Sequence, residues 1–213
     1  MARNTNYKSF RFKEAELGKF NHNAKDVVSL IEPNFRLLGL TNGQFSLIDL
    51  IKAILDKIGK SDVVCVTWSA GIKDANQVSW MKNSNMLKSF TLITDHSYVN
   101  RQKAYAVALD DLFGSENIRT SEIHAKFTLI QNEKWNIVIR TSMNLNANKT
   151  CESFEIDDNK EIYDFYYSFV EHIMTNQPKG MVADTKSAQT NMNSFFDKEP
   201  TQGFNFNFNF SNE

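Results

Sequence analysis

One stretch of the sequence gathers residue types that could act together on a phosphate. His124-x-Lys126 is followed by Ser142-x-Asn144 and then by Glu152. Residues two apart on a strand face the same side, so each pair can present both side chains together. Lysine supplies charge, serine and asparagine supply hydrogen bonds, and histidine can be a nucleophile or an acid and base. Glu152 could orient the imidazole, as a third group does in other nucleophile–base systems.

Each pair alone is weak evidence for a site. A His-x-Lys pair on a strand is usually part of a solvated face, and Ser-x-Asn is common in turns. The ordered combination, with apolar strand-like runs between its parts and an acid after it, favours a shared site.

The elements that must position these residues alternate between strand and helix. Short, apolar, β-branched runs predict strands at 62–68, 90–94, 127–130, 137–141 and near 154–156. Helical spacing predicts helices at 45–55, 72–86, 101–113 and 162–173. Such alternation predicts an α/β fold, a sandwich with a mixed central β-sheet flanked by helices. A hairpin between the strands at 127–130 and 137–141 would bring the two pairs together.

Composition divides the chain further. Residues 1–25 form a basic N-terminal arm, which could contact phosphates or form an edge strand. Residues 26–177 form the α/β domain. Residues 178–213, which contain no leucine or isoleucine, are expected to be a disordered tail. The tail is expected to dock a protein partner, or otherwise to self-associate, through the alternating Phe204, Phe206, Phe208 and Phe210.

Overall composition limits the possible functions. The 213 residues include 24 Lys+Arg and 25 Asp+Glu, so any nucleic-acid surface must be a local patch. With two cysteines, Cys65 and Cys151, a four-thiolate zinc site is excluded and a reducing compartment is expected. The first residues lack the apolar region of a signal peptide, and no apolar run reaches roughly 18 residues. We therefore expect a cytoplasmic protein without a membrane partner.

The motif residues resemble those of the phospholipase D superfamily. The mark of that family is H-x-K, four residues, Asp, and then G-S-x-N, commonly with a later Glu. His124-Ala125-Lys126 matches the first part, Thr141-Ser142-Met143-Asn144 matches the second with Thr for Gly, and Glu152 fits the later acid. The resemblance covers about residues 26–175. Gln131 occupies the position of the family's Asp.

The resemblance implies a metal-independent phosphodiesterase that needs no cofactor. Family enzymes bring two motifs together in one active site, and this chain has one, as the small bacterial nucleases of the family do. A two-fold homodimer would then place two motifs opposite each other. One His124 would form a phosphohistidine, and the partner's His124 would protonate the leaving oxygen and then activate water. Lys126, Ser142 and Asn144 would bind the phosphate oxygens.

We therefore expect a nuclease that acts on DNA or RNA. Two alternatives remain open. One is a phospholipid hydrolase or transferase. The other is a catalytically weak or inactive module that binds nucleic acid or a protein, which Gln131 and Thr141 favour. His96 follows a predicted strand, where α/β proteins place ligands, and could line the substrate groove.

Overall fold

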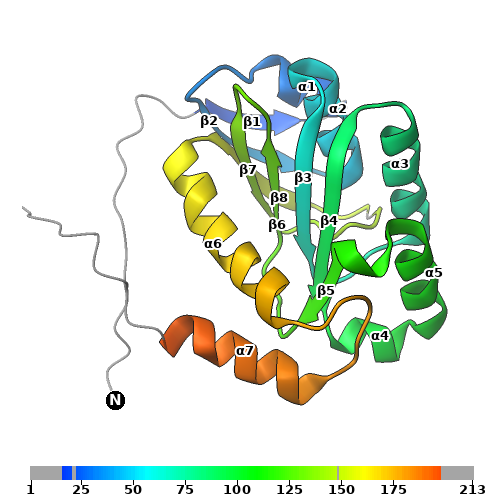
Figure 1. Ribbon diagram of the computed structural model, residues 1–213. Helices are drawn as coiled ribbons and strands as arrows, with labels where there is room; N and C mark the ends of the chain where they lie inside the picture. The colour runs from blue at the N-terminus through cyan, green and yellow to red at the C-terminus, as the bar shows by residue number, and fades with distance from the viewer. Residues whose placement is uncertain (1–15, 21–22, 148, 198–213) are drawn as a thin grey trace, which may run out of the picture.

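The computed structural model describes residues 16–20, 23–147 and 149–197, and its centre is one mixed β-sheet. The eight strands lie in the order β1-β2-β8-β7-β6-β3-β4-β5 (Figure 1). The neighbours β1–β2, β3–β4 and β4–β5 are parallel, and the four other neighbouring pairs are antiparallel. The strands are β1 (Glu16–Phe20), β2 (Arg36–Thr41), β3 (Ser61–Thr67), β4 (Leu87–Asp95), β5 (Ile118–Ser121), β6 (Phe127–Gln131), β7 (Asn136–Thr141) and β8 (Glu152–Asp158).

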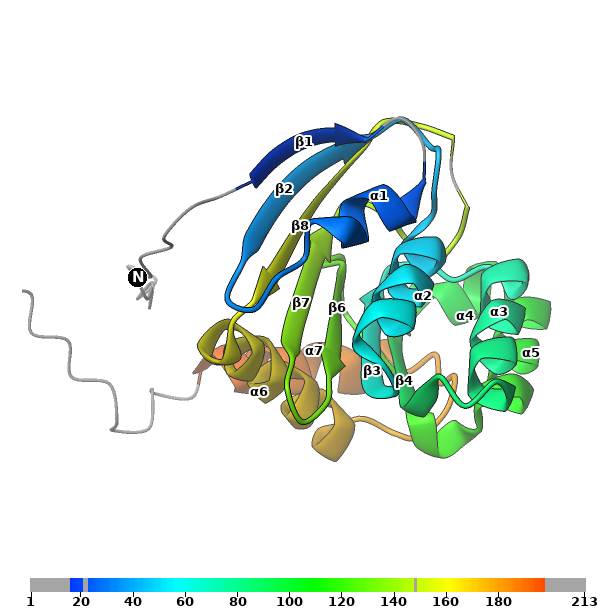
Figure 2. The same ribbon diagram turned by 90° about the horizontal axis from the view of Figure 1, so that it is seen from above.

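Helices cover both faces of this sheet, which confirms the predicted α/β sandwich (Figures 1 and 2). One face packs against α1 (Ala24–Ser29), α2 (Leu47–Ile58), α3 (Ile72–Asn83) and α5 (Lys103–Phe113). The other packs against α6 (Lys160–Asn176), with α7 (Thr185–Asp197) beside it. None of the helices in the described ranges has the length and apolar character needed to cross a membrane.

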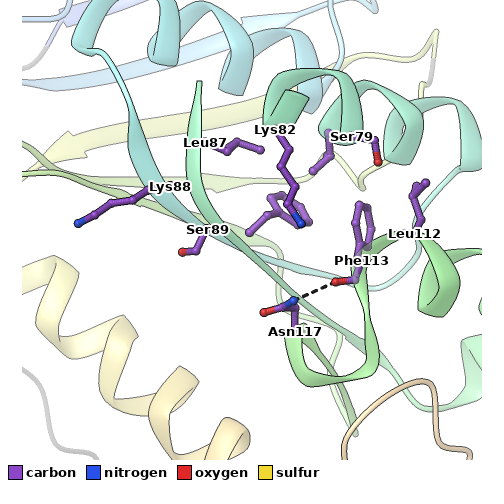
Figure 3. A pocket seen from close by; sticks show the side chains of 10 residues that line it. Ser79, Lys82, Leu87, Lys88, Ser89, Leu112, Phe113 and Asn117 are labelled. Carbon is purple, nitrogen blue, oxygen red and sulfur yellow. Dashed lines mark hydrogen bonds between the residues drawn. The ribbon is translucent and has the colours of Figure 1, made fainter. Parts of the chain in front are cut away.

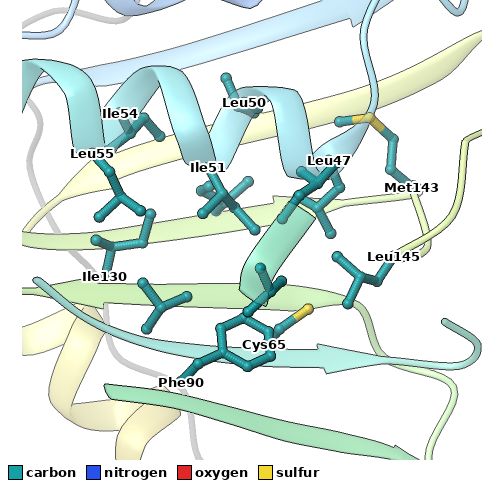
Figure 4. Packing of buried hydrophobic residues seen from close by; sticks show 14 of the residues in the cluster. Leu47, Leu50, Ile51, Ile54, Leu55, Cys65, Phe90, Ile130, Met143 and Leu145 are labelled. Carbon is teal, nitrogen blue, oxygen red and sulfur yellow. The ribbon is translucent and has the colours of Figure 1, made fainter. Parts of the chain in front are cut away.

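Helix α2 shows how local sequence and packing agree. Its N-terminus is a capping box, in which Ser46 accepts from the backbone of Asp49 and the Asp49 carboxylate accepts from the backbone of Ser46. Gly59 ends the helix with φ 89°, a conformation that glycine adopts without a steric penalty. The apolar side of α2 lies over strands that carry Cys65 and Ile130 (Figure 4). Burial raises the pKa of the Cys65 thiol to about 12.

Most predicted elements are confirmed within a few residues. The predicted strands correspond to β3, β4, β6, β7 and β8, and the predicted helices to α2, α3, α5 and α6. The strands β2 and β5 were not predicted, because both are short and carry arginine and threonine among their apolar residues. A separate short helix, α4 (Ser97–Arg101), precedes α5.

The prediction that residues 178–213 form a disordered tail is wrong for Thr185–Asp197, which forms α7. Ala188 of α7 is buried, and the Phe195 ring lies 5.4 Å from that of Phe169 on α6. His172 Nε2 also contacts the carbonyl oxygen of Asn191 at 2.8 Å. The segment orders because its few apolar residues recur at helical spacing and meet the aromatic side of α6. The predicted docking segment with Phe204, Phe206, Phe208 and Phe210 lies outside the described residues.

The N-terminal arm was predicted either to contact phosphates or to form an edge strand, and the structure confirms an edge strand for part of it. Glu16–Phe20 of the 1–25 segment is β1, which pairs in parallel with β2, and α1 begins at Ala24. Part of the arm therefore belongs to the sheet. It forms an edge strand, which is hydrogen-bonded to one neighbour, β2. The expected contacts of the rest of the arm fall on residues outside the described ranges.

Close packing at Gly39 of β2 gives a stability prediction. A Cβ atom at this position would lie 2.2 Å from the ring of Phe154, which is buried in the core. We expect Gly39→Ala to lower the free energy of unfolding by about 1–3 kcal/mol, because overpacking forces side chains and backbone to shift. Urea unfolding measures this change. The neighbouring Leu40 is 47% exposed, so Leu40→Ala should change stability by only about 0.5 kcal/mol. Equal losses from both variants would show that the contact with Phe154 is not limiting.

Candidate active site

The motif residues all lie at one edge of the sheet. Strands β3, β4, β5 and β7 end at this edge, whereas β6 and β8 begin there, because β6 is antiparallel to β3 and β7, and β8 is antiparallel to β7. His124 and Lys126 lie in the segment just before β6, not on the strand as predicted. Ser142 and Asn144 follow β7, and Glu152 is the first residue of β8. The topology thus brings together the five residues that the sequence predicts to form a site.

The imidazole of His124 is exposed at this edge. Its ring centroid lies 5.7 Å from that of Trp68, with the two planes tilted by 57°. Among the described residues, neither ring nitrogen of His124 has a hydrogen-bond partner, so both nitrogens are open to a substrate. The segment that carries it is held from behind, because Asp95, at the end of β4, accepts a hydrogen bond from the backbone of Ile123 at 3.2 Å.

Lys126 is half-buried next to His124. Its ammonium group donates a hydrogen bond to the carbonyl oxygen of His124 at 3.1 Å. Burial lowers the pKa of Lys126, and the negative charge of Glu152 opposes that shift. The opposing effect of Glu152 on this pKa shows that the first and last parts of the motif interact electrostatically.

The turn after β7 depends on two hydroxyl groups. The Thr141 hydroxyl donates to the carbonyl oxygen of Ser153 at 2.8 Å and accepts from the backbone of Met143 at 3.0 Å. The threonine that replaces the family's glycine therefore stabilises the turn. The Ser142 hydroxyl donates to the carboxylate of Glu152 and accepts from the backbone of Ser153. Since a serine has one hydroxyl hydrogen, Ser142 must release Glu152 before it can donate to a phosphate.

Glu152 also accepts a hydrogen bond from the Thr150 hydroxyl at 3.3 Å. The described hydrogen bonds of Glu152 are thus to hydroxyl groups, one of which belongs to the motif residue Ser142. Its predicted role in orienting His124 stays a prediction.

Alternating burial orients the loop that carries Asn144. Met143 and Leu145 are buried and approach Leu47 of α2, so Ser142 and Asn144 lie on the opposite side of the chain (Figure 4). The loop is also tied to the end of β3 by a bridge between Ala70 and Leu145.

Thr67, the last residue of β3, lies next to the Asn144 side chain. Its buried hydroxyl accepts a hydrogen bond from the backbone of Leu145 at 3.1 Å and lies 2.9 Å from the carbonyl oxygen of Ser69 and 3.3 Å from Asn144 Oδ1. Its one hydroxyl hydrogen can be donated to only one of these two oxygens at a time, and the Asn144 amide nitrogen is the end of that side chain that faces away from Thr67. Sequence reasoning missed Thr67, although its place at the end of a buried strand is a signal for a ligand site.

His96 lies at the same edge, beyond β4. Its Nδ1 is 3.3 Å from the carbonyl oxygen of Ser121 and 3.8 Å from the carboxylate of Asp95. These contacts attach His96 to the ends of β4 and β5. Its predicted place in the substrate groove stays a prediction.

Gln131 lies at the far end of β6. It stands five residues after Lys126, roughly 16 Å away at the usual rise of a strand. There its amide nitrogen donates to the side-chain oxygen of Asn136 at 2.9 Å. Gln131 therefore contacts the β6–β7 hairpin rather than the other motif residues.

A separate cavity of about 180 Å³ lies between α3, α5 and the beginning of β4 (Figure 3). Lys82 and Asn117 are among its lining residues, and none of the motif residues lines it. Because β4 begins at the opposite edge of the sheet, this cavity is no part of the candidate site. Within the described ranges, no cluster of three or more His, Cys, Asp or Glu side chains is suited to hold a metal ion.

No protein-family model matches the chain, and no curated sequence matches it significantly. The solved structures to which it is similar include NucT from Helicobacter pylori, at 14% identity over 68% of this chain and 99% of that one, with a TM-score of 0.48. Another is Nuc from Salmonella typhimurium, at 11% identity over 68% and 96% of the two chains, with a TM-score of 0.44.

Nuc is described as a phospholipase D family member. A third similar structure is TrmBL2, an archaeal chromatin protein described with a mode of DNA binding. It shares 10% identity over 71% of this chain and 55% of that one, with a TM-score of 0.43. At these identities and TM-scores, the likenesses carry no argument about function.

Proposed function

We propose that this protein is a phosphodiesterase that cleaves nucleic acid through a phosphohistidine formed on His124. The observation that carries the proposal is the meeting of three groups at one edge of the sheet. They are an exposed imidazole whose nitrogens have no partner among the described residues, a half-buried ammonium bound to the backbone oxygen of the same histidine, and an amide next to Thr67. A nucleophile, a cation and a hydrogen-bond donor are what phosphoryl transfer requires.

In the proposed first step, a ring nitrogen of His124 attacks phosphorus and the bond to the leaving oxygen breaks. The partner's His124 gives its proton to that oxygen in a two-fold dimer. Water then attacks phosphorus, the P–N bond to His124 breaks and frees the imidazole, and the partner's His124 accepts a proton from the water. Lys126 and Asn144 stabilise the charge on the nonbridging oxygens in both steps.

Hydrolysis assays with excess EDTA test the proposal. The substrates are bis(4-nitrophenyl) phosphate, single-stranded DNA, RNA and phosphatidylcholine vesicles. We expect turnover of the simple diester and of nucleic acid, unchanged by EDTA. Nucleic-acid binding without turnover of any substrate would support the binding-module alternative instead. Cleavage of the vesicles in preference to nucleic acid would support the phospholipid alternative.

The shared site predicts a homodimer. One motif per chain supplies one histidine, whereas the mechanism uses a nucleophile and a separate acid. Sedimentation at micromolar protein concentration should therefore show a dimer. A strict monomer that still turns over substrate would contradict the role of the partner's His124.

The pKa of Lys126 predicts a shift in the pH profile. Phosphate binding requires the charged ammonium, so kcat/KM should fall as the pH rises through this pKa. Glu152 raises the pKa of Lys126, so Glu152→Gln should lower it and move the alkaline fall to lower pH. The measurement is the position of the alkaline limb, not its height. Lys126→Arg is the control, because arginine stays charged and should remove this limb. An unmoved limb in Glu152→Gln would assign it to another group.

A further inference from the structure

The proposed mechanism leaves one contact beside His124 without a role. Trp68 lies in the loop after β3, and the guanidinium carbon of Arg101 lies over the Trp68 ring, 3.8 Å from its centroid. The same indole is 5.7 Å from the His124 ring. The indole thus connects an arginine to the proposed nucleophile.

Helix α4 holds this arginine in place. Tyr98 of α4 is 2% exposed and donates its hydroxyl hydrogen to the carbonyl oxygen of Ala70 at 2.6 Å. Ala70 belongs to the same loop as Trp68, and this loop is joined to the Asn144 loop through the bridge from Ala70 to Leu145. The helix that carries Arg101, the indole and the motif therefore form one connected arrangement.

The charge of Arg101 is available to a ligand. Its side chain is exposed, and no carboxylate of the described part of the chain is within ion-pair distance of it. A guanidinium held over an indole face keeps hydrogen-bond donors free and loses less conformational freedom when it binds an anion. This is a prearranged cation with no structural ion pair to satisfy.

The separation suits a second phosphate. The two ring distances place the guanidinium within about 10 Å of the imidazole, and a nucleic-acid strand carries one phosphate per roughly 3.4 Å of helix axis. A phosphate close along the strand from the one at His124 can therefore reach Arg101. The phosphate at His124 itself is already supplied with Lys126 and Asn144.

We propose that Arg101, held by Trp68, binds a second backbone phosphate and thereby selects polynucleotides over isolated diesters. The inference rests on the proposed function, since it assigns the first phosphate to His124. A phospholipid with a single phosphodiester offers Arg101 no second phosphate. Arg101 is thus a specificity residue, and Trp68 is a positioning residue for it.

The test separates binding from catalysis. In the full-length His124→Ala protein, affinity for a fluorescein-labelled oligothymidylate is measured by anisotropy at several salt concentrations, with and without Arg101→Gln. We expect about tenfold weaker binding, as for the loss of one charge-assisted hydrogen bond. The slope of log affinity against log salt should decrease in magnitude by about 0.7, the value for one phosphate contact on a single strand. Lys134→Gln is the matched control, because Lys134 is exposed on the β6–β7 turn at the opposite edge, and it should change neither value.

Kinetics in the active protein provide the second arm. Arg101→Gln should reduce kcat/KM for the oligonucleotide about tenfold more than for bis(4-nitrophenyl) phosphate. Trp68→Leu should weaken oligonucleotide binding, and adding it to Arg101→Gln should weaken binding no further. An unchanged salt slope, or equal losses on both substrates, would overturn the proposal. If the protein turns over no diester, the proposed function fails, while the binding arm still decides whether Arg101 contacts a phosphate.

Discussion

Replacing His124 with alanine should lower turnover of bis(4-nitrophenyl) phosphate and of DNA by about 10⁴-fold or more. In the proposed dimeric site, the His124 of one subunit is the nucleophile and the partner's His124 is the acid and base. A dimer of the variant therefore lacks both groups. His124 is exposed, and its described contact is the Trp68 ring, so the variant should remain folded. Stopped or continuous assays of nitrophenol release measure the loss.

The matched control is His172→Gln. His172 lies on α6, and its Nε2 contacts the carbonyl oxygen of Asn191 on α7 rather than a motif residue. This variant should keep turnover within a few-fold of the natural protein. If both histidine variants lose activity equally, the loss reflects global structure. If His124→Ala keeps more than a tenth of the activity, no covalent route through His124 operates.

The second large effect is expected for Lys126→Ala. Removal of one group that stabilises charge in a transition state typically costs about 3 kcal/mol, which is 10² or more in rate. Lys126 is half-buried, and its ammonium is 3.1 Å from the backbone oxygen of His124, the residue that carries the proposed nucleophile. We therefore expect a fall in kcat of at least about 10²-fold. Lys134→Ala, at the opposite edge, should leave kcat unchanged.

Affinity for nucleic acid checks the same assignment. If Lys126 only attracts the negatively charged substrate, its removal should raise KM and leave kcat unchanged. An interaction that is equally strong in the ground state and the transition state affects KM alone. A near-natural kcat for Lys126→Ala would therefore exclude it from charge stabilisation. Asn144→Ala should show a comparable loss of kcat, since its amide hydrogens serve the same oxygens.

Local pattern predicted the elements whose sequence matches their surroundings. The β3 run from Asp62 to Thr67 is apolar and buried, and α2 has both a capping box and a glycine end, so neighbouring residues determine each element. Helix α7 was missed because its composition resembles that of a disordered segment. Its order depends on Phe169 and other residues of α6, which local composition does not reveal.

The same distinction between local pattern and long-range contact applies to the residues of the candidate site. His124, Lys126 and Asn144 could be proposed from the sequence because their spacing is local and resembles a known motif. Thr67 and Arg101 could not, since each reaches the candidate site only through a contact across the fold. The hydroxyl of Thr67 meets the amide of Asn144 across 77 positions of the chain, a relation that no spacing rule within one strand contains.

A second long-range contact between the same two loops has a consequence for the order in which the molecule folds. The backbone of Gly71 donates to the carbonyl oxygen of Leu145 at 2.7 Å, and this contact closes a loop that includes β4, β5, β6 and β7. Closing a loop of this length costs chain entropy before the contact contributes any stabilisation, so nonlocal pairings of this kind form slowly. Lys126 and His124 can therefore be adjacent in a nascent chain that still lacks the asparagine arm of the site. Pulsed hydrogen exchange during refolding should show the amide of Gly71 gaining protection after the amides of α2, so that the candidate site is completed at the end of folding.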